Sequence, residues 1–151
     1  MQVDEIMTSA SVTESPSDSL VAAAEKMWRQ QTGSLVVMDG DQLVGIITER
    51  DIMKAIAQGT DVHASVADVM TRDVLTIPPH TTLHEAARHM AARWIRHLPV
   101  VADGKVVGLV SQRDLVGVFA ALVDDPDGAQ LASEELVRSR RLARIEQGDL
   151  D

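Results

Sequence analysis

Residues 43–52 read Leu-Val-Gly-Ile-Ile-Thr-Glu-Arg-Asp-Ile, and residues 106–115 read Val-Val-Gly-Leu-Val-Ser-Gln-Arg-Asp-Leu. Each stretch begins as a short apolar run containing a glycine, which is typical of a buried strand that another backbone approaches closely. Each run ends at a hydroxyl residue, followed three positions later by an aspartate and then by an apolar helical pattern. The two stretches therefore predict a strand that leads directly into a capped helix.

The hydroxyl residue and the aspartate have defined places at the start of such a helix. Thr48 and Ser111 are predicted N-caps, and Asp51 and Asp114 fall at the third helical position, where a carboxylate faces the positive end of the helix. The same groups suit a ligand, because a phosphate can use the hydroxyl and the unpaired N–H groups, and a ribose diol the carboxylate. Such caps stabilise a helix by about 1 kcal/mol even where nothing binds, so the pattern by itself leaves both roles open.

The two stretches belong to an internal repeat with an offset of 106 − 43 = 63 residues. Alignment of residues 3–58 with residues 66–121 needs no gap and gives 16 identities in 56 positions. The chain is therefore two copies of a unit of about 60 residues plus a tail. We expect a first repeat at residues 1–60, a second at 61–123, and an acidic linker with a C-terminal helix at 124–151.

Composition limits the possible functions and locations. The net charge of −9 disfavours nucleic acid and anionic membranes as partners. The chain has no cysteine for disulfides or thiolate metal sites, and neither a signal peptide nor an apolar run near 18 residues is recognisable. These features predict a soluble, cytoplasmic protein. Since a unit of about 60 residues buries little surface, the copies should share a core.

Both repeats predict the element order β-α-β-β-α, an α/β (α+β) fold. The expected strands and helices are residues 12–13, 20–27, 35–38, 43–48 and a helix from 49 in the first repeat, and 74–77, 83–90, 98–101, 106–111 and a helix from 112 in the second. Short lead-in segments at 3–7 and 66–70 precede them. Beyond the break at 124–128, a helix starting near Ser133 has a weak apolar stripe, which predicts a frayed or partner-dependent element.

A tandem β-α-β-β-α unit with Gly-x-x-Ser/Thr-x-x-Asp after its third strand resembles the CBS domain family, named for cystathionine beta-synthase. The motif stands at residues 45–51 and 108–114, and the match extends to IRHLPVV at 95–101 and to the Met-Thr pairs at 7–8 and 70–71. The resemblance covers about residues 3–123. It implies a pseudo-twofold pair, often called a Bateman module, with two clefts between the copies. Such pairs commonly form homodimers shaped as a flat disc.

In many family members these clefts bind adenine nucleotides or S-adenosylmethionine. The motif aspartate contacts the ribose and the hydroxyl residue the phosphate, while the first strand and the residues before the second strand line the base. Charged residues before the second strand hold phosphates in some members. Carried over by position, the resemblance implies ligand contacts at Thr13, Glu14, Thr48, Asp51, Thr76, Ile77, Ile95, Arg96, His97, Pro99, Ser111, Arg113 and Asp114.

The repeats differ before the second strand, where the first has Gly33-Ser34 and the second Arg96-His97. Arginine supplies a permanent charge and histidine a further donor. The difference predicts unequal clefts, with the better nucleotide site at the second repeat. Across a pseudo-twofold axis, however, charges from one copy can also reach a phosphate whose ribose the other copy holds.

The leading hypothesis is a stand-alone, homodimeric regulatory module that binds AMP, ADP, ATP or S-adenosylmethionine and requires no cofactor. An enzyme is not expected, because no nucleophile–base pair or Gly-rich phosphate loop is present. The spacing of His80, His84 and His89 does not favour a metal site. The alternative hypothesis is a ligand-free adaptor that holds an unidentified protein partner through dimerisation and its C-terminal helix.

Overall fold

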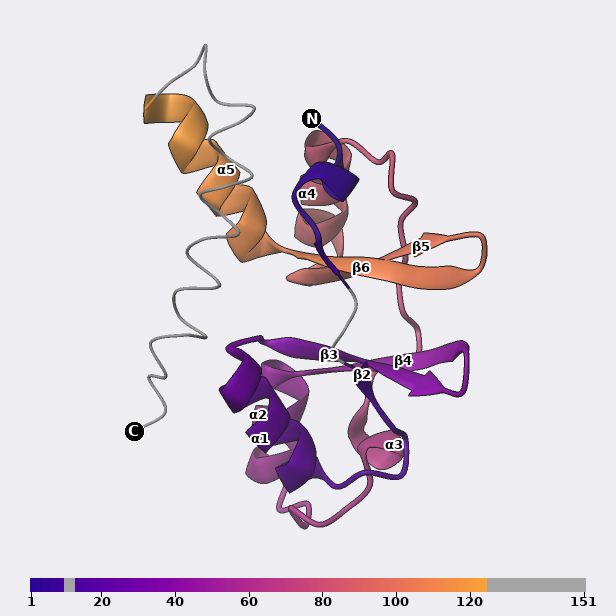
Figure 1. Cartoon of the computed structure of the whole chain (residues 1–151). Helices are drawn as coiled ribbons and strands as arrows, with labels where there is room; N and C mark the ends of the chain where they lie inside the picture. Colours follow the sequence, from indigo (N-terminus) through magenta and orange to yellow (C-terminus); the bar gives the residue numbers. More distant parts are fainter. Residues whose placement is uncertain (10–12, 125–151) are drawn as a thin grey trace. The chain divides into compact units, whose positions relative to one another are not determined.

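The computed structural model describes residues 1–9 and 13–124, which form two compact units (Figure 1). One unit consists of residues 13–74 and is called the 13–74 unit below. The other consists of residues 75–124 together with residues 1–9 and is called the 75–124 unit. Each unit is a small sheet with helices packed on it, which confirms the predicted mixed α/β fold.

The 13–74 unit contains one three-stranded sheet of order β2-β3-β4, in which β2 runs parallel to β3 and β3 antiparallel to β4. Its elements are β2 (Thr13–Glu14), α1 (Leu20–Gln30), β3 (Ser34–Asp39), β4 (Gln42–Thr48), α2 (Glu49–Ala57) and α3 (Val66–Val69). On the other side of β4, Thr71 forms an isolated antiparallel bridge with Ile46. Helices α1 and α2 lie together against the sheet (Figure 1).

The 75–124 unit repeats this arrangement with the order β1-β6-β5. Its elements are η1 (Val3–Glu5), β1 (Thr8–Ser9), α4 (Leu83–Arg93), β5 (His97–Ala102), β6 (Lys105–Ser111) and α5 (Gln112–Asp124). The strand predicted at 74–77 is reduced to a parallel bridge between Ile77 and Val100, because only the Ile77 backbone bonds to β5. The predicted β-α-β-β-α order is otherwise confirmed in both repeats.

The lead-in segment of each repeat packs on the sheet that belongs to the other repeat. Thr8 pairs with Leu109 of β6, and Thr71 pairs with Ile46 of β4. The glycine of each motif permits this contact. A Cβ built on Gly45 would lie 2.6 Å from Met70 Sδ, closer than real Cβ contacts, and 3.0 Å from the Thr71 carbonyl oxygen, tighter than most of them. The predicted close backbone approach is thus confirmed.

Each unit has its own apolar cluster, and each cluster draws on both repeats. Val66 and Met70 of the second lead-in join the cluster of the 13–74 unit, and Val3 and Ile6 of the first lead-in join the other. The core sharing expected from the short repeat length therefore takes the form of exchanged lead-in segments.

Within residues 1–9 and 13–124, no helix combines the length and the apolar character needed to cross a membrane. The helix predicted from Ser133 and the break at 125–128 lie outside the described residues, as does Val12.

Candidate functional site

The turn from β4 into α2, called the β4–α2 corner, is a reciprocal cap between Thr48 and Asp51. The Asp51 amide donates to Thr48 Oγ1 at 3.2 Å, and the Thr48 amide donates to Asp51 Oδ2 at 3.0 Å. The Thr48 hydroxyl also donates to Asp51 Oδ2 at 3.0 Å. The predicted N-cap is confirmed, and it places a half-buried carboxylate at the start of the helix.

The turn from β6 into α5, called the β6–α5 corner, repeats this geometry with Ser111 and Asp114. The Ser111 amide and hydroxyl donate to Asp114 Oδ2 at 2.7 and 2.9 Å, and the Asp114 amide donates to Ser111 Oγ at 3.2 Å. Asp114 is buried, whereas Asp51 is half-buried. In both corners the hydroxyl proton points at the carboxylate, so a phosphate that used this donor would have to compete with the aspartate.

The residues just before β3 and β5 form backbone hydrogen bonds with the β4–α2 and β6–α5 corners, respectively. The Gln112 amide of α5 donates to the Arg96 carbonyl at 2.8 Å, and the Glu49 amide of α2 donates to the Gly33 carbonyl at 3.0 Å. His97 is paired in register with Ser111. The structure thus brings the charged pair of the second repeat to the β6–α5 corner, whereas the β4–α2 corner has Gly33 there.

The predicted site residues divide between the two units. Thr13, Glu14, Thr48 and Asp51 lie in the 13–74 unit, and Thr76, Ile77, Ile95, Arg96, His97, Pro99, Ser111, Arg113 and Asp114 lie in the 75–124 unit. Arg96 and Arg113 are exposed, His97 is half-buried, and Pro99 is buried. Ile95 packs against the apolar cluster of its unit. The β6–α5 corner therefore combines a buried carboxylate with exposed cations.

The two segments expected to line a base alternate between exposed and buried side chains. Thr13 is exposed and Glu14 is buried, and Thr76 is exposed and Ile77 is buried. This is the period of a strand with one face against the core. In the 13–74 unit β3 separates β2 from β4, so Thr13 is not on a strand next to the β4–α2 corner. The threonines are the members of each pair whose side chains solvent can reach.

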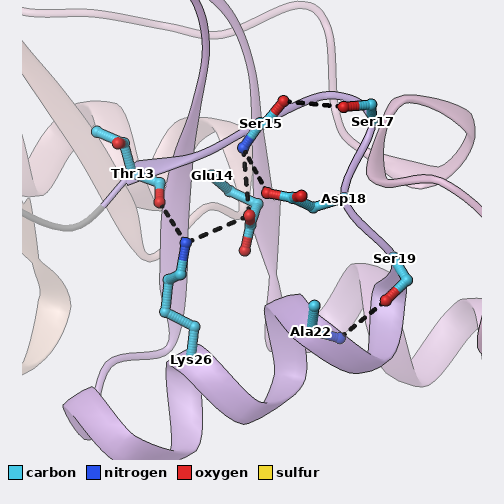
Figure 2. A network of polar contacts seen from close by, with 8 residues as sticks. All are labelled: Thr13, Glu14, Ser15, Ser17, Asp18, Ser19, Ala22 and Lys26. Atoms are coloured by element: carbon cyan, nitrogen blue, oxygen red, sulfur yellow. Dashed lines mark hydrogen bonds and ion pairs between the residues drawn. The ribbon is translucent and has the colours of Figure 1, made fainter.

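Glu14 belongs to a network between β2 and α1 (Figure 2). Its Oε1 accepts a bond from Lys26 Nζ at 3.3 Å and one from the Ser15 amide at 3.2 Å, while its Oε2 is buried without a hydrogen-bond partner. Lys26 Nζ also donates to the Thr13 carbonyl at 2.8 Å. The Glu14 carboxyl thus links the strand to the helix, and the ligand contact that the resemblance implied for it stays a prediction.

Burial raises the pKa of Glu14, and the neighbouring Asp18 carboxyl raises that pKa further. The neighbouring Glu14 carboxyl lowers the pKa of Asp18, whose Oδ2 accepts a bond from the Ser15 amide at 3.2 Å. Of the two carboxyls, Glu14 is the one that retains a proton to higher pH.

Thr71 joins the β4–α2 corner, although sequence reasoning gave it no role. Its Oγ1 donates to Asp51 Oδ1 at 3.2 Å, across 20 positions of sequence. The signal was available in the Met-Thr pairs at 7–8 and 70–71, which repeat at the same offset as the motif. The pairs indicated the family but did not indicate which strand end they would contact.

Comparison with known proteins identifies the repeat. The family model of the CBS domain matches residues 3–58 and 66–121. An uncharacterized protein of Methanopyrus kandleri is 35% identical over 127 residues, which cover 82% of this chain but only 65% of that relative's length. The CBS domain-containing protein YhcV of Bacillus subtilis is 34% identical over 75% of this chain and 81% of its own length.

A solved structure has the same fold and a related sequence. It is the CBS domain pair of protein MJ0100 in complex with 5′-methylthioadenosine and S-adenosyl-L-methionine. It is 31% identical to this chain, with a TM-score of 0.74, and the alignment covers 79% of this chain and 99% of that one. Two matches to one family model, at the offset at which the sequence repeats, show that this chain belongs to the CBS domain family and contains a tandem pair of CBS domains.

Proposed function

We propose that this protein is a regulatory module that binds an adenosine-containing ligand at its two strand–helix corners. The observation that supports the proposal most directly is the equivalent placement of Asp51 and Asp114, each at the third position of a helix with its carboxylate beside the helix N-terminus. A carboxylate is a strong acceptor for the hydroxyls of a ribose. The structure of MJ0100 contains two such ligands, 5′-methylthioadenosine and S-adenosylmethionine, and both carry an adenosine group.

These two ligands contain no phosphate, which suits corners whose hydroxyl protons already point at the aspartates. Recognition of the ribose and the base is therefore the minimal requirement at either corner. AMP, ADP and ATP add a phosphate, for which Arg96 and His97 at the β6–α5 corner supply donors. We therefore assign the nucleotide preference to the β6–α5 corner, with S-adenosylmethionine as the other candidate ligand.

Regulation rather than catalysis follows if ligand occupancy changes the protein's conformation or association. A ligand does this only when it binds one arrangement better than another. The protein would then need no cofactor, and its output would pass to a protein partner or through a change within a homodimer.

The test is a thermal-shift panel of AMP, ADP, ATP, GTP, 5′-methylthioadenosine and S-adenosylmethionine on the full chain. A ligand at 100 times its dissociation constant stabilises the folded state by about 2.7 kcal/mol. We expect at least one adenosine compound to raise the melting temperature, and the rise to shrink in Asp51→Asn or Asp114→Asn. If no compound of the panel changes the melting temperature of the wild-type protein, the proposal is wrong.

A second candidate function is a ligand-free adaptor, and the outer faces of α2 and α5 favour it. Large apolar side chains are exposed at equivalent positions of the two repeats, with Met53 and Ile56 on α2 and Val116 and Phe119 on α5. Exposed apolar side chains grouped in this way mark association surfaces. An adaptor would associate through these faces and show no response to any compound of the panel.

A further inference from the structure

Asp51 has two oxygens with different surroundings at the β4–α2 corner. Oδ2 accepts the amide and the hydroxyl of Thr48, both at 3.0 Å, and so belongs to the helix cap. Oδ1 accepts the hydroxyl of Thr71 at 3.2 Å, and the same hydroxyl lies farther from Oδ2, at 3.5 Å. The residue that contacts Oδ1 thus comes from the second lead-in segment and not from the motif that contains Asp51.

The position of the Thr71 hydroxyl is determined by its backbone. The Thr71 amide donates to the Ile46 carbonyl and the Ile46 amide to the Thr71 carbonyl, both at 2.9 Å. Gly45 lets this segment lie directly on β4, since a Cβ there would come within 3.0 Å of the Thr71 carbonyl oxygen. Because both the amide and the carbonyl of Thr71 are bonded to Ile46, its hydroxyl can hold the Asp51 carboxylate in one orientation.

The pair presents two neighbouring acceptors to solvent. The Thr71 hydroxyl donates its proton to Oδ1 and can still accept through its lone pairs, and Oδ1 can accept a second hydrogen bond. Thr71 is exposed and Asp51 is half-buried, so both atoms are within reach of a ligand. A vicinal diol offers two O–H donors on adjacent carbons, which match two acceptors that lie 3.2 Å apart.

We propose that Thr71 is a positioning and specificity residue of the ligand site at the β4–α2 corner, an inference that rests on the proposed function. It orients Asp51 Oδ1 and accepts the second hydroxyl of a ribose diol. The corner then selects ribonucleosides over deoxyribonucleosides, because a deoxyribose leaves one of the two acceptors without a donor. Discrimination comes from the Thr71–Asp51 pair and not from the aspartate alone.

The experiment is calorimetry on the full chain with two probes, AMP and 2′-deoxy-AMP, on wild type, Thr71→Val and Thr71→Ser. Valine preserves the shape but removes the hydroxyl, and serine restores it. We expect Thr71→Val to weaken AMP about tenfold at the event that Asp51→Asn removes, with little change for 2′-deoxy-AMP. The ratio of the two affinities should fall toward one, and Thr71→Ser should restore it.

Thr8→Val is the matched control, since Thr8 pairs with Leu109 as Thr71 pairs with Ile46 but lies in the 75–124 unit. It should leave the Asp51-dependent event unchanged. An unchanged affinity ratio in Thr71→Val, or an equal loss for both probes together with a lower melting temperature, would show that Thr71 is only structural. If wild type binds neither AMP nor any other compound of the thermal-shift panel, the proposed function itself fails, which is a distinct outcome.

Discussion

Lys26 on α1 lies 3.3 Å from the Glu14 carboxylate on β2. Among the described residues, Lys26 is the only cation that forms an ion pair with this buried carboxylate. The Glu14 side chain is 1% exposed, whereas that of Lys26 is 39% exposed, so the ammonium reaches into the protein from the surface. The equivalent positions in the second repeat are Ile77 and His89, and Ile77 belongs to the apolar cluster. The first repeat thus carries a charged pair where the second repeat has an apolar residue and a histidine.

Breaking this pair should destabilise the protein more than replacing it. Lys26→Met leaves the Glu14 carboxylate buried without its cation, and we expect a loss of about 1–3 kcal/mol in the free energy of unfolding. The double variant Glu14→Ile with Lys26→Met removes both charges and places the isoleucine of the second repeat at position 14, and it should recover most of that loss. Urea unfolding of the three proteins measures both effects. A Lys26→Met variant as stable as wild type would contradict the role assigned to the pair.

The shifted pKa values of Glu14 and Asp18 predict that the free energy of unfolding changes with pH in opposite directions above and below about pH 4. Because the pKa of Glu14 is raised above 4.5 in the folded protein, the folded state binds its proton more tightly, and stability falls as pH rises from 4.5 to the raised value. Because the pKa of Asp18 is lowered below 3.8, its contribution is present above pH 3.8 and is lost as pH falls toward the lowered value.

Glu14→Gln tests this assignment, since the amide keeps the shape but does not titrate. The difference in unfolding free energy between Glu14→Gln and wild type should grow in favour of the variant as pH rises above 4.5. Chemical denaturation at several pH values between 3 and 7 measures it. A constant difference across that range would mean that Glu14 titrates in the folded protein as it does in the unfolded chain.

The two corners should respond differently to a phosphate. Arg96→Ala removes an exposed cation from the β6–α5 corner, so we expect about a tenfold weaker affinity for AMP and an unchanged affinity for 5′-methylthioadenosine. Asp114→Asn should weaken both ligands, because both contain the ribose. Asp51→Asn should leave the tighter AMP event nearly intact. Calorimetry with the two ligands separates these cases, and loss of the tight event in Asp51→Asn would reverse the assignment.

The exposed apolar faces of α2 and α5 predict a homodimer in which a second copy covers them. Ile56→Glu and Phe119→Glu introduce charge at equivalent positions and should each shift the protein toward monomer in sedimentation velocity at micromolar concentration. Trp28→Glu on α1 is the control, since Trp28 is also exposed but lies on another helix. A shift in the Trp28 variant alone would place the interface on α1, and a monomeric wild type would exclude the dimer.

Sequence alone determined the elements that depend on neighbours a few positions away. The caps Thr48–Asp51 and Ser111–Asp114 are predicted and are confirmed by the structure, because an N-cap and the third helical residue are in reach whenever the helix forms. The repeat offset extended each such prediction to both halves and gave the element order and the family.

The tertiary structure alone decided which groups far apart in sequence meet. A glycine at position 45 indicated a close approach but not that Met70 and Thr71 make it, and nothing local to Asp51 indicates a hydroxyl 20 residues later. The resemblance implied a ligand contact for Glu14, and only the fold showed that its carboxylate is buried beside Lys26 of α1. These contacts depend on how the chain returns to each sheet, which is determined by the packing of the whole unit and not by the local preferences of any segment.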